Sequence, residues 1–342
     1  MPSKTELKQQ YAGFITKYQN NVVKGELEIK EDESITNVLF QELIGVHKTL
    51  TLTKCPNVTF ESASSKLSTL IINNSGLICI KGIKQMTDLL ELNLENNMIS
   101  DLSELQYLAE LMILNLSHNQ IKSLKGLEGL KDLENINLED NKIESVEELK
   151  DLPVLYHLCL NKNQISSLKG LEGLESITYL WLNENKISDL EPLKNLKSKK
   201  LEDLSLSENQ IESLLPLSDL ENLTSLDLAL NNIRSLNGLE KLVNLTWLDL
   251  IQNHICDLKQ LEALTNIQTL KLIDNEVESV EFLKNMKDLE ELLLYRNKIT
   301  NVDGLKDLNS LKKLDIECNY VQNFSPIQNH PNYKNYKLEK QK

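Results

Sequence analysis

The sequence of 342 residues predicts an α/β solenoid with a parallel β-sheet on one side and 3₁₀ or short helical segments on the other. One pattern, LxxLxLxxNxIxxLxxLxxLxx, recurs with a period of 22 residues between Leu67 and Asn332. Apolar residues two apart are typical of a short strand, and apolar residues three apart are typical of a 3₁₀ turn. A fixed repeat overrides the expectation that a chain of this length forms two or three globular domains.

The twelve copies begin at equivalent apolar positions, and one of them departs from the period. They start at Leu67, Leu89, Leu111, Leu133, Leu155, Ile177, Leu201, Leu223, Leu245, Ile267, Leu289 and Leu311. The copy that begins at Ile177 carries two extra residues in the 197–200 stretch.

Each position of the repeat has a predicted role. The paired leucines of Leu-x-Leu share one face of a strand and point inward. Eleven copies carry asparagine at the ninth position, and only Ser75 departs. Because an amide offers both donors and an acceptor, a stacked column of asparagines can satisfy the backbone where the chain leaves the strand. One repeat has about seven inward apolar side chains, too few to offset the ordering of its chain, so stacking must stabilise the array.

The two ends depart from the repeat. Residues 1–23 have apolar side chains at helical spacing and predict an amphipathic cap, or alternatively a partner-binding helix. Residues 24–66 predict two degenerate repeats with strands at Leu27-x-Ile29 and Leu50-x-Leu52. Residues 333–342 form a predicted C-terminal cap tail, whose last five residues we expect to fray.

The repeat resembles the leucine-rich repeats of the SDS class, over about 266 of the 342 residues. Such repeats occur in protein phosphatase 1 regulatory subunit 7, in bacterial internalins and in many protist proteins. The resemblance implies a curved horseshoe with the parallel sheet on its concave face and no enzymatic activity. It identifies no individual contact residue.

Composition and charge narrow the functional classes. The net charge of −14 argues against a nucleic-acid partner, because phosphate binding needs a basic stripe. No apolar run is long enough to span a membrane, and the N-terminus lacks the apolar segment of a signal peptide. The five cysteines show no pairing pattern, which is typical of a reducing compartment. We therefore expect a cytoplasmic monomer, with the nucleus as the alternative location.

Function is predicted to lie at positions 3, 5 and 7, which point outward from each strand. Both tryptophans of the chain fall there, and a run of apolar residues occupies position 7 of consecutive copies. We predict a protein-binding surface with its first part at Tyr156, His157, Cys159, Tyr179 and Trp181, its second part at Asp227, Leu230, Trp247, Asp249, Ile251, Ile273, Leu293 and Tyr295, and Asp203 between the two. Exposed aromatic residues flanked by acids are typical of interface hot spots. The alternative is that repeat drift leaves tolerated apolar residues on strands.

An acidic stretch of Glu202, Asp203 and Glu208 lies between the two parts. It predicts either a seat for a basic residue of the partner or ordinary solvation.

No catalytic or cofactor site is predicted. The histidines lack metal-ligand spacing, the glycines belong to the turns of the repeat, and no carboxylate is expected to be buried enough to shift its pKa. We expect a non-enzymatic scaffold that binds a protein partner on its concave face. Two alternatives stay open: a regulatory subunit of a phosphatase 1 type catalytic subunit, and an internalin-like surface or host-interaction protein.

Overall fold

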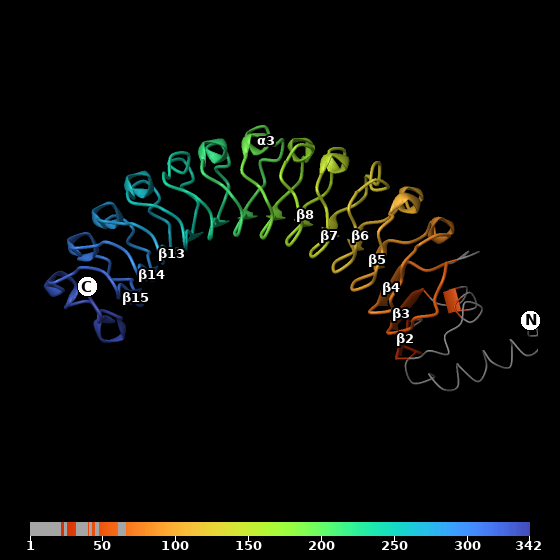
Figure 1. The fold of residues 1–342 in the computed structure, drawn as a ribbon, viewed down its shortest axis with the longest axis horizontal. Helices are drawn as coiled ribbons and strands as arrows, with labels where there is room; N and C mark the ends of the chain where they lie inside the picture. The colour runs from red at the N-terminus through yellow and green to blue at the C-terminus, as the bar shows by residue number, and fades with distance from the viewer. Residues whose placement is uncertain (1–21, 24–25, 32–39, 41–42, 45–47, 61–65) are drawn as a thin grey trace, which may run out of the picture. The chain divides into compact units, whose positions relative to one another are not determined.

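The protein is described by a computed structural model covering residues 22–23, 26–31, 40, 43–44, 48–60 and 66–342. The chain divides into two compact units, each of which is a stack of repeats. Unit 1 comprises residues 1–164 and 173–175, and unit 2 comprises residues 165–172 and 176–342. In each unit the strands lie on one side of the stack and the 3₁₀ segments on the other (Figure 1).

The strands of unit 1 follow one another in sequence order. They are β1 (Val22–Val23), β2 (Glu26–Lys30), β3 (Thr49–Thr53), β4 (Thr69–Asn73), β5 (Glu91–Asn93), β6 (Ile113–Asn115), β7 (Asn135–Asn137) and β8 (His157–Cys159). All pair in parallel except β1, which runs antiparallel to β2.

The strands of unit 2 are all parallel. They are β9 (Tyr179–Trp181), β10 (Asp203–Ser205), β11 (Ser225–Asp227), β12 (Trp247–Asp249), β13 (Thr269–Lys271), β14 (Glu291–Leu293) and β15 (Lys313–Asp315). Each residue pairs with the residue at the same position of the next repeat, so Leu226 lies beside Leu248 and Leu248 beside Leu270.

Short helical turns cover the opposite side, as the three-residue apolar spacing predicts. The 3₁₀ helices are η2 (Ile83–Gln85), η3 (Ser103–Tyr107), η4 (Glu147–Leu149), η5 (Leu171–Gly173), η6 (Leu215–Leu217), η7 (Lys259–Leu261), η8 (Glu281–Leu283), η9 (Asp303–Leu305), η10 (Ser325–Ile327) and η11 (Tyr333–Asn335), and α3 (Glu191–Lys194) is a single α-helical turn. Some repeats have a turn with glycine in place of the helix, as at Gly238: its φ is +107°, and an added Cβ would lie 2.3 Å from the Leu214 carbonyl oxygen.

The asparagine column does what its position predicts. The Asn253 amide donates to the carbonyl oxygens of Leu228 (2.9 Å) and Leu250 (3.2 Å), and its Oδ1 accepts from the Ile233 amide (3.0 Å). Asparagines from Asn97 to Asn319 repeat this arrangement and are buried. The side chain therefore replaces backbone partners that the turn out of the strand leaves unmade.

The degenerate N-terminal repeats are confirmed where the structure describes them. Strands β2 and β3 contain the two predicted Leu-x-Ile and Leu-x-Leu pairs, and all four side chains are buried. Cys55 stands at the asparagine position, and its amide donates to the Ser75 hydroxyl (3.0 Å). The predicted cap helix lies outside the described residues, apart from Val22 and Val23, which form strand β1 instead of helix.

The C-terminal tail continues the repeat, so the expectation that its last five residues fray is wrong. Lys337 pairs with Asp315 as a further parallel bridge. Gln341 takes the place of the column asparagine: it donates to the Ile316 carbonyl (3.1 Å) and accepts from the Val321 amide (3.1 Å). The sequence pattern did not identify this thirteenth, partial copy, because it has glutamine where the other copies have asparagine.

The two extra residues of the sixth copy are absorbed just before β10. Ser198 is buried and donates to the Ile177 carbonyl (2.8 Å), while Lys199 and Lys200 remain exposed. The core leucines on either side, Leu196 and Leu201, keep their buried positions. Among the described residues, no helix is long and apolar enough to cross a membrane.

Candidate protein-binding face

The outward side chains of β9 to β15 and of the residues that follow each strand form one surface of unit 2, which we call the strand face. Position 3 runs from Tyr179 to Lys313, position 5 from Trp181 to Asp315, and position 7 from Asn183 to Glu317. Because equal positions of successive repeats are about 4.8 Å apart, each column is a row of touching side chains.

The apolar part of the strand face lies on β12 to β14. Trp247, Ile251, Ile273 and Tyr295 are half-buried. Ala229, at the same position as Ile251, is almost covered. The available apolar surface is therefore centred on these four residues, three of which occupy position 7.

Two further residues of the predicted site lie differently from the others. Leu293 points outward from β14 but is only 9% exposed, because its neighbours cover it. Leu230 is 42% exposed, but it occupies the turn after β11 with φ of 55° rather than the sheet itself. It lies at the rim of the strand face.

The two tryptophans are not placed in open solvent, which corrects the sequence-based expectation. The Trp181 indole Nε1 donates to Asp203 Oδ1 (3.0 Å). Lys271 Nζ lies 4.6 Å from the centroid of the Trp247 ring, within cation–π range. Each ring is held by a side chain from the following repeat and presents only part of its surface.

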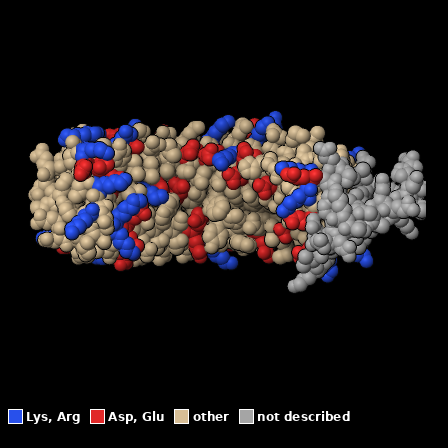
Figure 2. Space-filling model, turned by 90° about the horizontal axis from the view of Figure 1, so that it is seen from below, with Lys and Arg blue, Asp and Glu red and all other residues tan. Residues whose placement is uncertain are grey.

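Lysines neutralise most acids of the strand face. Each pair joins a carboxylate to a lysine of the following repeat: Asp249–Lys271 (3.0 Å), Glu291–Lys313 (2.7 Å), Asp315–Lys337 (3.2 Å) and Glu317–Lys340 (3.6 Å). Figure 2 shows the lysine and arginine side chains gathered toward the C-terminal end of this face, on the left. Sequence reasoning missed these pairs, although a spacing of 22 or 23 residues between an acid and a lysine reveals them.

Asp203 and Asp227 lack such a partner. In the part of the chain that the structure describes, neither carboxylate forms an ion pair. Asp227 accepts from the Ala229 amide (3.1 Å) and from the Ser205 hydroxyl (3.5 Å). Burial raises the pKa of the Asp227 carboxyl above its ordinary value, although the Ala229 hydrogen bond opposes the shift. The expectation that no carboxylate is buried enough to shift its pKa is therefore wrong for this residue.

The remaining predicted residues lie in unit 1. Tyr156 is exposed just before β8, and His157 is half-buried with its Nδ1 3.1 Å from the Asn135 amide oxygen. Cys159 is buried, which raises the pKa of its thiol to about 11. Tyr179 and Trp181 belong to unit 2, so a common patch with Tyr156 and His157 stays a prediction.

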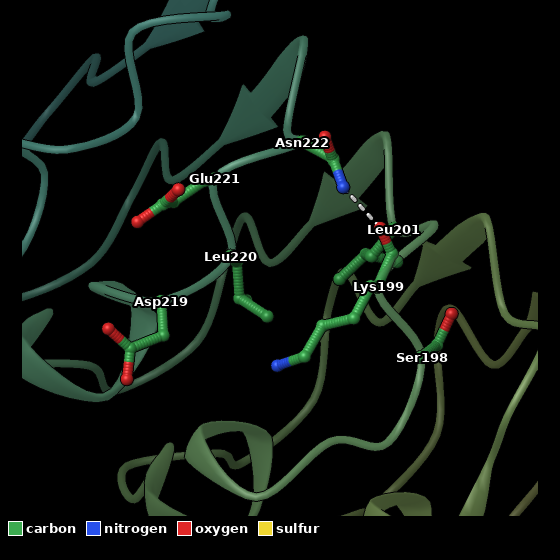
Figure 3. A pocket seen from close by; sticks show the side chains of 7 residues that line it. All are labelled: Ser198, Lys199, Leu201, Asp219, Leu220, Glu221 and Asn222. Atoms are coloured by element: carbon green, nitrogen blue, oxygen red, sulfur yellow. Dashed lines mark hydrogen bonds between the residues drawn. The ribbon is translucent and has the colours of Figure 1, made fainter.

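A pocket of about 450 Å³ lies beside the two-residue insertion. Figure 3 shows Lys199 and Asp219 approaching it from opposite sides, with the Asn222 amide directed at the Lys199 carbonyl, to which it donates. A wider groove of about 720 Å³ runs along the edge where the strands begin and shares Lys199 and Asn222 with this pocket. In the described residues, no group of three His, Cys, Asp or Glu side chains could hold a metal ion.

Comparison with known proteins agrees with this architecture. The family model described as leucine-rich repeats (2 copies) matches residues 111–151, 155–195 and 287–329. No curated protein matches the sequence. Together with the repeated structure, the match shows that the chain is a leucine-rich-repeat protein.

Three solved structures illustrate the likeness. An internalin, InlF, from Listeria monocytogenes is 28% identical, with a TM-score of 0.65, over 79% of this chain and 86% of that one. A leucine-rich-repeat protein of Leptospira interrogans is 23% identical, with a TM-score of 0.69, over 90% and 93%. The plant peptide hormone receptor RGFR1, solved in complex with RGF2, is 22% identical, with a TM-score of 0.70, over 86% of this chain and 51% of the receptor.

Proposed function

We propose that this leucine-rich-repeat protein is a non-enzymatic scaffold that binds a partner protein on the strand face of unit 2. Leucine-rich-repeat folds in general are protein-interaction scaffolds. The observation that carries the proposal is the half-buried apolar row of Ile251, Ile273 and Tyr295 just after three adjacent strands, with the half-buried Trp247 on the same face at the start of β12. Contiguous apolar surface around an aromatic residue is typical of a binding hot spot, whereas scattered single residues need no explanation.

The charges around this cluster support binding rather than catalysis. The Asp249–Lys271 pair lies beside Trp247 and is largely shielded from water, so it fixes the ring without needing a ligand. An apolar centre with a charged rim is the usual anatomy of a protein interface.

Affinity purification from a cell lysate with the tagged full chain, followed by mass spectrometry, tests the proposal. We expect proteins recovered by the wild type to be lost with the Trp247→Ala/Ile251→Ala double variant, each substitution weakening binding by more than about 1 kcal/mol. Leu215→Ala is the matched control, because Leu215 is 60% exposed on η6, on the other side of the stack. Recovery of the same proteins by the double variant, with its fold intact, would place the binding site elsewhere.

A second candidate function is an internalin-like surface or host-interaction protein. The 28% identity to InlF over most of both chains favours it. Fractionation separates the two: a protein on the cell exterior supports the second candidate, whereas a cytoplasmic protein bound to an intracellular partner supports the first. A phosphatase catalytic subunit among the recovered proteins would identify the first candidate as a phosphatase regulatory subunit.

A further inference from the structure

Four side chains on β10 and β11 form a square on the strand face. Asp203 pairs in register with Ser225, and Ser205 with Asp227. The two aspartates therefore occupy one diagonal of the square and the two serines the other. We call these four residues the aspartate–serine square.

Tryptophans lie on both sides of the square. Trp181 on β9 is the neighbour of Ser205, and Trp247 on β12 is the neighbour of Ser225. Serine is small, so the diagonal of Ser205 and Ser225, which runs between the two tryptophan rings, carries little side-chain volume. The square is thus a low, acidic area between two large aromatic side chains.

The square is where the charge pattern of the strand face breaks. Four of the six acids of the strand face are paired with a lysine of the following repeat. For Asp203 and Asp227, the residue at the same position of the following repeat is not a lysine: it is Ser225 for Asp203 and Asp249 for Asp227. Lys271 is already engaged with Asp249 and with the Trp247 ring. Two neighbouring carboxylates, both half-buried, therefore lack a counter-charge within the described chain.

We propose that the partner places a basic side chain, arginine in preference, on the aspartate–serine square between Trp181 and Trp247, and an apolar side chain on Ile251 and Ile273. A guanidinium offers five donors in one plane, so it can bond two carboxylates and stack on an aromatic ring at the same time. The inference rests on the proposed function, because it names the chemistry of a partner bound on the same face.

The geometry of the sheet sets the spacing between the two partner residues. The square occupies positions 3 and 5 on β10 and β11, whereas Ile251 and Ile273 occupy position 7, just after β12 and β13. Two strand spacings across the sheet are about 10 Å, and three residues along a strand add about 10 Å at a right angle, so the two places are about 14 Å apart. A partner segment that runs obliquely across the strands at about 3.3–3.6 Å per residue therefore needs its apolar residue about four positions from its basic residue.

The test uses a phage-displayed library of random peptides selected on the full chain. We expect the selected peptides to carry arginine or lysine about four positions from an apolar residue, and to need Trp247 for binding. One such peptide, synthesised and titrated by calorimetry, should bind the Asp203→Asn/Asp227→Asn variant about ten-fold more weakly or worse, and should bind the wild type more weakly as salt increases. Glu291→Gln is the matched control, because Glu291 lies on the same face but is already paired with Lys313.

Each other outcome points to a different failure. Selected peptides that need Trp247 but bind the Asp203→Asn/Asp227→Asn variant as well as the wild type would overturn the basic-residue proposal and leave the proposed function standing. A selection that yields no Trp247-dependent peptide would overturn both. Far-ultraviolet circular dichroism and urea unfolding of every variant confirm that lost binding is not lost folding.

Discussion

The two sides of each strand in unit 2 obey different rules. On the inner side, Leu226, Leu248 and Leu270 are completely buried at the same position of successive repeats, and each neighbouring asparagine satisfies the backbone in the same way. On the outer side, the equivalent rows change from serine to tryptophan and from aspartate to lysine within two repeats. The fold is therefore stabilised by the uniform side, and the variable side is free to carry recognition.

The largest expected effect is on the inner side. Leu248→Ala removes a fully buried side chain and should lower the free energy of unfolding by about 2–5 kcal/mol. Trp247→Ala, one residue away, is the control: its half-buried side chain should cost clearly less stability although it is larger. Urea unfolding followed by circular dichroism measures both. Equal losses would mean that the two sides of the strand do not differ as described.

A second test addresses the asparagine column. Asn253→Ala leaves the buried Ile233 amide without its acceptor and removes one of the two side-chain donors to the Leu228 carbonyl, which keeps the Asn231 amide. An unsatisfied buried group costs about 1–3 kcal/mol, so we expect a loss of that size in urea unfolding. Asn232→Ala is the control and should change stability little, because Asn232 is exposed and follows Asn231, the column asparagine of the preceding repeat. A loss no larger than that of the control would show that water or the backbone replaces the amide.

This difference between the two sides also explains what the sequence could predict. The inner positions repeat every 22 residues, so period and residue type identify the strands, the asparagine column and the 3₁₀ turns. Where the residue type changes but the role does not, as at Gln341, the pattern alone failed.

The outer side was predicted less completely. The columns are set by the period, so it could be predicted that Trp247 and Ile251 lie on the same face in the rows of positions 3 and 7. What each side chain contacts could not, because burial on this side depends on the length and conformation of neighbouring side chains. Leu293 is covered, the Trp181 indole is hydrogen-bonded to Asp203, and Lys271 lies over Trp247. None of these contacts follows from spacing alone.

The smallest expected effect compares two neighbouring aspartates on the outer side. Burial raises the pKa of Asp227 in the folded state, so its ionised form destabilises the fold. The contribution of protonated Asp227 to the free energy of unfolding is fully present below the pKa of an unfolded aspartate, about 3.9. This contribution is lost as pH rises through the higher pKa of the folded state, because the buried carboxyl then ionises. Asp227→Asn should therefore be more stable than the wild type near neutral pH, with the gain disappearing in acid.

Asp249→Asn should behave in the opposite way near neutral pH, because it removes the partner of Lys271 from a largely buried ion pair. Urea unfolding of both variants at neutral and acidic pH measures the contrast. The two neighbouring aspartates of the same column would then change the free energy of unfolding in opposite directions. Asp249 is stabilised by its ion pair with Lys271, whereas the charge of Asp227 has no such partner. If Asp227→Asn instead destabilises the protein at neutral pH as much as Asp249→Asn does, a counter-charge within the chain must already compensate Asp227, and the basis for a basic residue from the partner is lost.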